Sequence, residues 1–174
     1  MTEKAIFSGG CFWCLEAFFS KRHGVEQVRS GYTGGQLINP SYEMVAAGKT
    51  GHYEAVGVLF DPSLCGYREL VIDFWRHIDP TQSDGQFMDI GPSYETAIFY
   101  VNDEQREISE DIYRQVCDFF PKVYTVIRPF ERFYPAESRH QNYARSHPEH
   151  YALYERFSNR SEVLDRLWKN KDLH

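Results

Sequence analysis

The chain has 174 residues, and its 42% hydrophobic and 25% charged residues are those of an ordinary globular protein of one domain, residues 1–174, whereas its aromatic share of 16% is unusually high. Its formal net charge of −6 argues against a nucleic-acid partner, because such surfaces need clustered Lys and Arg. No apolar run approaches the roughly 18 residues of a membrane span, and the N-terminal residues lack a secretory pattern, so we expect a cytoplasmic protein with no membrane partner.

The first third of the chain alternates short apolar runs with glycine-marked turns. In chain order these patterns predict a strand over 5–7, a helix over 12–21, a strand over 25–32, a short helix over 42–47 and a strand over 53–60. The first helix follows Gly9 and Gly10, so we expect Cys11 where that helix begins. The strand over 53–60 is apolar on both faces apart from Glu54, which is typical of a central strand.

The remaining elements are longer and end in a helical tail. After the turn at 61–63, a helix is expected to bury a stripe made of Leu70, Val71, Phe74, Trp75 and Ile78. Then follow a polar loop over 79–93, a strand over 94–101, a helix over 103–120, a strand over 123–127 and helices over 148–157 and 162–168. The order up to residue 101 is β-α-β-β-α-β. We therefore predict an α+β fold with a ferredoxin-like core, one additional helix and strand, and an elaborated C-terminal tail.

Two of the four cysteines stand three positions apart, in the run Gly10-Cys11-Phe12-Trp13-Cys14. The thiolate is the reactive form of cysteine, and the free N–H groups of a helix start stabilise it, so we expect a lowered pKa for Cys11. On a helix the two thiols share a face at a separation that a disulfide allows. Cys14 is thus placed to resolve a sulfenic acid formed on Cys11.

Three other interpretations of this pair stay open. In the first, the pair is half of a zinc site, although neither Cys65 nor Cys117 supplies a second C-x-x-C. In the second, the pair is a general thioredoxin-like redox motif, although two bulky aromatic residues separate the cysteines. Alternatively, both thiols are only buried, as free cysteines commonly are. We expect Cys65 to be a turn thiol and Cys117 to lie in the core face of its helix.

Longer stretches of the chain resemble the A-type peptide methionine sulfoxide reductases. The resemblance is carried by residues 10–14 with Glu16, and by 30–35, 39–42, 51–54, 79–82, 85–89, 91–94, 133–137 and 140–141. It implies a single catalytic domain that reduces methionine-S-sulfoxide, free or in proteins, as repair after oxidative damage. It implies no metal and no organic cofactor, and a thioredoxin-type dithiol as the reductant that resets the enzyme.

The resemblance also implies roles for individual residues. Cys11 attacks the sulfoxide sulfur, and Cys14 resolves the sulfenic acid to a disulfide. The substrate-binding set comprises Phe12 and Trp13 as the apolar wall for the S-methyl group, Tyr42 and Tyr94 as donors to the sulfoxide oxygen, and Asp89 at the pocket edge.

Glu54 is the candidate acid of the reaction. A sulfoxide is a poor electrophile until its oxygen is protonated, so the site needs a carboxylic acid kept neutral by burial. Glu54 shares a strand face with Val56, Val58 and Phe60, which we expect to remove it from water.

Two features depart from the pattern of the family. Glu95 stands where many relatives carry Arg, which reverses a charge near the site. No cysteine follows Cys117, so we expect the relay to end at the Cys11–Cys14 disulfide. Two rival functions stay open: a module that binds Met peptides without turnover, and a dithiol–disulfide oxidoreductase that ignores sulfoxides.

Overall fold

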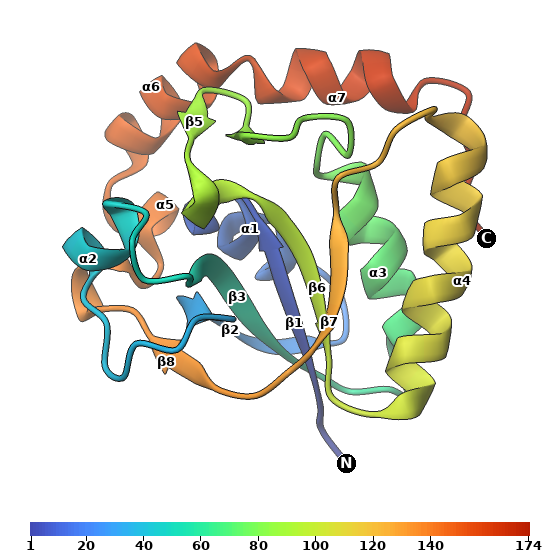
Figure 1. Ribbon diagram of the computed structural model, residues 1–174, viewed down its shortest axis with the longest axis horizontal. Coiled ribbons are helices and arrows are strands. Elements are labelled where there is room, and N and C mark those ends of the chain that lie inside the picture. Colours follow the sequence, from blue (N-terminus) through green and yellow to red (C-terminus); the bar gives the residue numbers. More distant parts are fainter.

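Six strands form one sheet in the order β7-β6-β1-β3-β2-β8 in the computed structural model, which describes residues 1–174 (Figure 1). The strands are β1 Glu3–Gly9, β2 Val25–Thr33, β3 Tyr53–Phe60, β6 Thr96–Tyr100, β7 Val126–Pro129 and β8 Phe133–Pro135. The four inner strands, β6-β1-β3-β2, pair antiparallel throughout. Helices join β1 to β2 and β3 to β6, so the predicted ferredoxin-like core is confirmed. β7 extends it parallel to β6, and β8 extends it antiparallel to β2.

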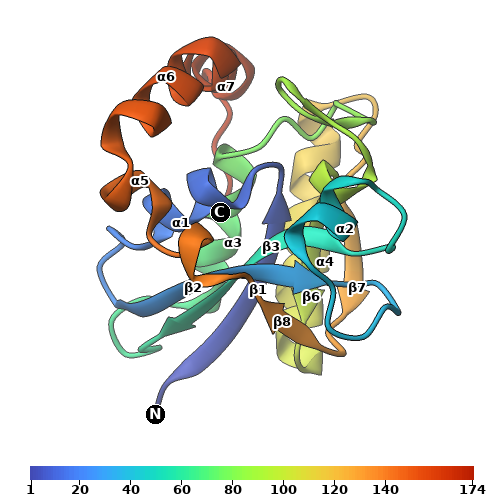
Figure 2. The same ribbon diagram turned by 90° about the vertical axis from the view of Figure 1, so that its left-hand side faces the viewer.

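Seven α-helices surround this sheet. They are α1 Phe12–Phe19, α2 Tyr42–Ala46, α3 Tyr67–Arg76, α4 Asp103–Phe119, α5 Tyr143–Ser146, α6 Pro148–Ser158 and α7 Arg160–Trp168. α3 and α4 lie side by side, whereas α6 and α7 run across one end of the sheet, above α1 (Figures 1 and 2). A small hairpin, β4 Gly85–Gln86 and β5 Asp89–Ile90, lies at the same end. None of the helices is long and apolar enough to cross a membrane.

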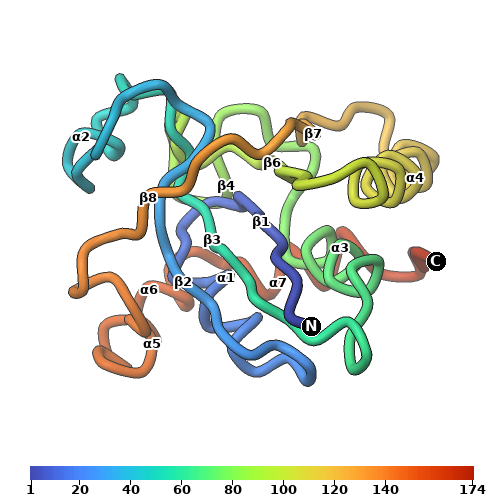
Figure 3. The backbone as a smooth tube through the Cα atoms, turned by 90° about the horizontal axis from the view of Figure 1, so that it is seen from below, coloured from blue at the N-terminus to red at the C-terminus, as the bar shows by residue number.

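The two faces of the sheet bury different amounts of apolar surface. Alternate residues of β1 point to opposite sides, so Phe7 belongs to the large core under α1, α3 and α4, and Ile6 to a small cluster on the other face. The Phe7 ring stacks on Phe19 at 5.3 Å and on Phe74 at 5.0 Å between ring centroids. Figure 3 shows α1 and α3 on one side of β1 and β3 and the β7–β8 segment on the other. The large cluster fixes α1 against the sheet, and with it the residues at its first turn.

Some details differ from the sequence-based expectations. The last predicted strand begins at Val126 instead of 123, because the N–H of Tyr124 donates to the carbonyl of Pro80 in a loop. Neither β8 nor α5 was predicted, since three or four residues are too few to show a period. Cys117 is exposed, so its placement in the core face of α4 was wrong, whereas Cys65 is a buried thiol in the turn before α3.

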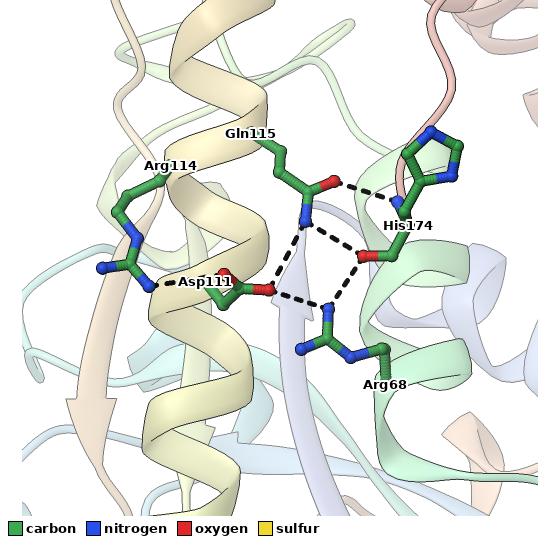
Figure 4. A network of polar contacts seen from close by, with 5 residues as sticks. All are labelled: Arg68, Asp111, Arg114, Gln115 and His174. Atoms are coloured by element: carbon green, nitrogen blue, oxygen red, sulfur yellow. Dashed lines mark hydrogen bonds and ion pairs between the residues drawn. The ribbon is translucent and has the colours of Figure 1, made fainter.

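Polar contacts fasten the end of the chain to α3 and α4 (Figure 4). Arg68 donates from Nη1 to Asp111 Oδ2 and to the carbonyl of His174, both at 2.8 Å. The Gln115 amide bonds the N–H and the carbonyl of His174, and Trp168 donates from Nε1 to the carbonyl of Ile78. These contacts are partly exposed and individually weak, but together they hold α7 along the end of the sheet where α1 begins.

Candidate active site

The predicted site residues gather at one end of the sheet because of its antiparallel pairing. β3 runs opposite to β1 and β2, so its first residues lie beside their last ones, and Glu54 is paired with Tyr32. Gly9 at the end of β1 is paired with Thr96 at the start of β6, which brings Tyr94 to the same end. Residues from four separate segments therefore meet around the start of α1.

The turn between β1 and α1 needs glycine. Gly10 has φ +81°, and a Cβ there would stand 2.6 Å from Cβ of Gln86. Both conditions exclude other residues without a shift of the backbone. Cys11 follows as the N-cap of α1, where the sequence placed it.

Glu54 lies against the first turn of α1. Glu54 is 1% exposed, and its Oε2 accepts a hydrogen bond of 3.1 Å from the backbone N–H of Phe12. Burial raises the pKa of Glu54 to about 8, the Phe12 N–H opposes this shift, and the charge of Asp89 adds to it. The carboxyl group is consequently protonated at neutral pH, which is the state that a proton donor needs.

Cys11 and Cys14 are free thiols, each 6% exposed and hydrogen-bonded to the other through their side chains. Burial raises the pKa of Cys11 well above its usual value, and the charges of Glu54 and Asp89 raise it further. The pKa of Cys14 is lowered to about 7 by the hydrogen bond with Cys11, helped by the charge of Arg160. The expected low pKa of Cys11 was therefore wrong, because burial of the thiol outweighs the stabilisation of a thiolate by the helix end.

Tyr42 and Tyr94 face the same space as the acid and the thiol. Burial raises the pKa of both phenols, and the charges of Glu54 and Cys11 raise it further. Each side chain influences the pKa of the other, and both keep their protons at neutral pH. Glu137, which the sequence reasoning quoted but left without a role, accepts from the N–H of Tyr42 at 3.1 Å and so fixes the start of α2.

The two aromatic residues between the cysteines occupy different surroundings. Phe12 is buried among the rings of Tyr32, Tyr42 and His140, with centroid distances of 5.9, 6.4 and 5.6 Å. Trp13 is partly exposed, and its ring stacks on Tyr143 of α5 at 3.8 Å. The two rings supply an apolar surface beside Cys11, and the C-terminal tail covers part of it.

Asp89 contacts a residue that the sequence reasoning missed. The hydroxyl of Tyr154 in α6 donates to Oδ2 of Asp89, and the same ring lies edge-on to Trp13 at 6.1 Å. Burial raises the pKa of Asp89 despite this hydrogen bond. Tyr154 thus joins the C-terminal tail to the pocket edge. One tyrosine among twelve in an unassigned tail gave no signal for such a contact.

Buried charges mark two further residues: Glu16, which the sequence analysis named without a role, and Arg160, which it missed. Glu16 is 2% exposed on the otherwise apolar face of α1 and accepts from the N–H of Tyr143 at 3.4 Å, which fixes α5. Arg160 at the start of α7 is 6% exposed. A charged residue among the apolar positions of α1 was the available signal for Glu16. Glu95 is half-buried, burial raises its pKa, and its backbone carbonyl accepts from Ser8.

Comparisons with known proteins agree with each other. The family model described as peptide methionine sulfoxide reductase matches residues 3–172. Peptide methionine sulfoxide reductase MsrA of Bacillus licheniformis is 45% identical over 97% of this chain and 95% of its own, and that of Listeria innocua is 46% identical over 96% of each. The crystal structure of Mxr1 from Saccharomyces cerevisiae in reduced form matches with a TM-score of 0.76 and 30% identity, covering 85% of this chain and 87% of Mxr1. Mxr1 has also been solved in complex with Trx2.

Proposed function

The chain belongs to the peptide methionine sulfoxide reductase family, and on that premise we propose how its own residues reduce methionine-S-sulfoxide. The observation that carries the proposal is the buried Glu54 carboxyl, hydrogen-bonded to the residue after Cys11 and protonated at neutral pH. A neutral acid beside a buried thiol is the pair of groups that oxygen transfer from a sulfoxide requires.

In the first step Cys11 takes the oxygen from the substrate. The S-methyl group lies against Phe12 and Trp13, and the sulfoxide oxygen accepts from Tyr42 and Tyr94. The Cys11 sulfur attacks the sulfoxide sulfur while its proton passes along the hydrogen bond to the Cys14 thiolate, and Glu54 protonates the oxygen. In the adduct that results, the hydroxyl passes from the substrate sulfur to the Cys11 sulfur while the bond between the two sulfurs breaks, so that methionine leaves with its sulfur reduced and Cys11 is oxidised to the sulfenic acid.

In the second step Cys14 removes the oxygen from the enzyme. After Cys14 has lost its proton again, its thiolate attacks the Cys11 sulfur, the S–O bond breaks, and the oxygen leaves as water with a proton. The lowered pKa of Cys14 keeps a large share of this thiol ionised near pH 7. The product is a Cys11–Cys14 disulfide.

A thioredoxin-type dithiol then reduces this disulfide and resets the enzyme. The complex of yeast Mxr1 with Trx2 supports a reductant of this kind. Such a partner fits the cytoplasmic location that we propose, since a reducing compartment keeps the resting thiols free. Asp89, with the backbone of a peptide substrate as its partner, completes the proposed site.

Replacement of Cys11 by Ser tests the proposal against its two rivals. We expect Cys11→Ser to abolish methionine formation, because a hydroxyl does not accept the oxygen, and to retain binding of a sulfoxide peptide. A simple disulfide tested as a substrate should be reduced far more slowly than the sulfoxide by the unmodified enzyme. Methionine formation by Cys11→Ser would refute the nucleophile, and a preference for the simple disulfide would favour the general oxidoreductase.

A further inference from the structure

The two cysteines have different surroundings. The charges that bear on Cys11 come from Glu54, Asp89 and Cys14, on the side of the proposed substrate pocket. Cys14 lines a separate open cavity of about 420 Å³ between α1, α6 and α7, and Cys11 does not line it. The other lining residues are Ala17, Phe18, Lys21, Arg22, His77, Tyr151, Glu155, Arg160, Ser161 and Leu164. Cys14 therefore borders a cavity that Cys11, the proposed nucleophile, does not line.

Arg160 in this cavity is a buried cation that forms no salt bridge; its guanidinium lies over the Phe87 ring, 4.6 Å from the ring centroid, and its charge opposes the burial that raises the pKa of Asp89. Arg160 is 6% exposed, and its Nη2 donates to the carbonyls of Gly9 at 3.0 Å and His77 at 2.8 Å. Nε and Nη1 have no hydrogen-bond partner. Nη1 lies 3.8 Å from the position that a Cβ on Gly10 would take, directly before Cys11. A buried guanidinium with two unused donors stabilises a negative charge that comes close to it, so an anion in the cavity beside Cys14 would be favoured.

The other charged groups around Cys14 do not fill this role. Arg22 is already paired with Asp73 at 2.7 Å and Glu69 at 3.3 Å, and Lys21 is exposed at the mouth. The carboxylate of Glu155 is exposed and accepts from Tyr151. On the opposite side of Cys14 lie Cys11 and Glu54, and His77 uses Nδ1 to bond the carbonyl of Asp73. Arg160 forms a salt bridge with none of these groups, and its charge acts on two acids: Asp89, which already accepts a hydrogen bond from Tyr154, and the thiol of Cys14.

The charge that faces Arg160 depends on the redox state. In the reduced enzyme the interaction with Cys11 and the charge of Arg160 lower the pKa of Cys14 to about 7, so ionisation of Cys14 places a negative charge in the field of Arg160. When Cys14 enters a disulfide with Cys11 that charge disappears, and Arg160 is left unpaired next to the sulfur that a reductant must reach. An incoming thiolate restores the lost charge at that moment.

From this arrangement we propose that the cavity beside Cys14 is the entry site for the reductant, and that Arg160 holds the reductant's attacking thiolate against the disulfide. The inference rests on the proposed function, in which the Cys11–Cys14 disulfide forms. The thiolate attacks the Cys14 sulfur, a mixed disulfide with Cys14 forms, and the Cys11–Cys14 bond breaks to leave a Cys11 thiolate, which takes up a proton. The second thiol of the dithiol then attacks the mixed disulfide, so that the reductant leaves oxidised and Cys14 is a thiolate again. Arg160 acts on the incoming sulfur, and the substrate side stays separate.

The experiment measures the opening of the preformed Cys11–Cys14 disulfide. The enzyme is oxidised with one equivalent of methionine sulfoxide, the disulfide is mapped, and second-order rate constants for its reduction are measured with a thioredoxin and, separately, with dithiothreitol. Two variants on different elements test the cavity: Ala17→Trp fills it from α1, and Arg160→Gln removes the charge. We expect each to lower the rate constant on the order of tenfold or more, and by much more than it lowers the single-turnover yield of methionine.

Matched controls separate the cavity from general effects. Ala152→Trp places the same ring on the exposed surface of α6, and Arg166→Gln removes an exposed charge of α7. In both variants the Cys11–Cys14 disulfide should be reduced at the rate of the unmodified enzyme. Arg160→Lys keeps the charge and should recover most of the loss in Arg160→Gln. Slowing with thioredoxin alone identifies a docked protein, and slowing with both reductants identifies any thiolate; either outcome supports the entry site.

The inference would be overturned if both reductants reduced the Cys11–Cys14 disulfide of Ala17→Trp and of Arg160→Gln at the rate of the unmodified enzyme. Equal slowing of Arg160→Lys and Arg160→Gln would overturn the role of the charge. Failure of the unmodified enzyme to form the Cys11–Cys14 disulfide is a different result, since it refutes the proposed function and is seen in the mapping step before any reductant is added.

Discussion

The Glu54 carboxyl group accepts a hydrogen bond of 3.1 Å from the backbone N–H of Phe12, the residue that follows Cys11. The first turn of α1 thereby faces a carboxyl group as well as a thiol, and strand β3 supplies the acid from 42 positions further along the chain. Because the group is buried, it retains a proton in the range where an exposed glutamate is ionised. The acid and the nucleophile are held together by the backbone of α1, independently of a substrate.

Replacement of Glu54 by Gln is expected to lower the rate of methionine formation by about a hundredfold or more, since the amide has no proton to give. Single-turnover methionine formation, followed without reductant, measures this step alone. In the unmodified enzyme the rate of this step should fall as pH rises through about 8, where Glu54 loses its proton. An unchanged rate in Glu54→Gln, or a pH profile that the substitution leaves intact, would exclude Glu54 as the acid.

The same substitution should stabilise the fold at alkaline pH. The folded-state pKa of Glu54 is raised to about 8 from a usual value of 4.5, so between these two pH values the folded protein binds more protons than the unfolded chain. The stability contributed by the neutral carboxyl is complete below 4.5 and is lost as pH rises, with a slope of about 1.4 kcal/mol per pH unit. Denaturant titrations measure the free energy of unfolding of both proteins. Between pH 5 and pH 8 the value for Glu54→Gln should rise relative to that of the unmodified protein, with about the slope given above. Parallel pH dependences would contradict the buried neutral acid.

Cys14→Ser should form about one methionine per enzyme and then stop with thioredoxin as the reductant, because the sulfenic acid on Cys11 has no resolving thiol. The two remaining cysteines provide the matched control. Cys65 lies buried in a turn and Cys117 lies exposed on α4, and neither lines the Cys14 cavity. Cys65→Ser and Cys117→Ser should turn over repeatedly, whereas repeated turnover by Cys14→Ser would remove it from the relay.

The hydroxyls of Tyr42 and Tyr94 should be worth most in the oxygen-transfer step. Each of Tyr42→Phe and Tyr94→Phe is expected to lower its rate by about tenfold to a hundredfold, because one donor to the oxygen is lost. Since both hydroxyls donate to the same oxygen and each influences the pKa of the other, the double variant should lose less than the product of the single effects. Rates of single-turnover methionine formation for the four proteins test this. Fully multiplicative losses would show that the two phenols act independently.

Much of the fold follows from patterns within single elements. The sequence predicted the buried strand β3 and the helix α4 at their observed positions, because β3 is a continuous apolar run apart from Glu54 and α4 repeats apolar residues at helical spacing over several turns. β8 pairs with β2 from more than a hundred positions away, and its three residues contain no period. Cys117 was misplaced because it is next to Val116, and one position on a helix is enough to turn a side chain from the core to solvent.

The site divides along a similar line. Glu54 could be selected from the sequence because a carboxylate in an apolar strand is unfavourable for folding and therefore indicates a chemical role. The pKa of Cys11 could not, because it depends on the carboxyl groups of Glu54 and Asp89 and on the depth of burial, which only the packed structure sets. Tyr154 and Arg160 reach the site from the C-terminal tail through tertiary contacts, and no local spacing announces them.

The most direct test of the account uses the two separated epimers of methionine sulfoxide. Each is incubated with one equivalent of enzyme without reductant, methionine is quantified, and the disulfides are mapped by mass spectrometry. We predict one methionine per enzyme from the S epimer, none from the R epimer, and a single new disulfide joining Cys11 to Cys14. Reduction of the R epimer, or a disulfide that involves Cys65 or Cys117 instead, would contradict it.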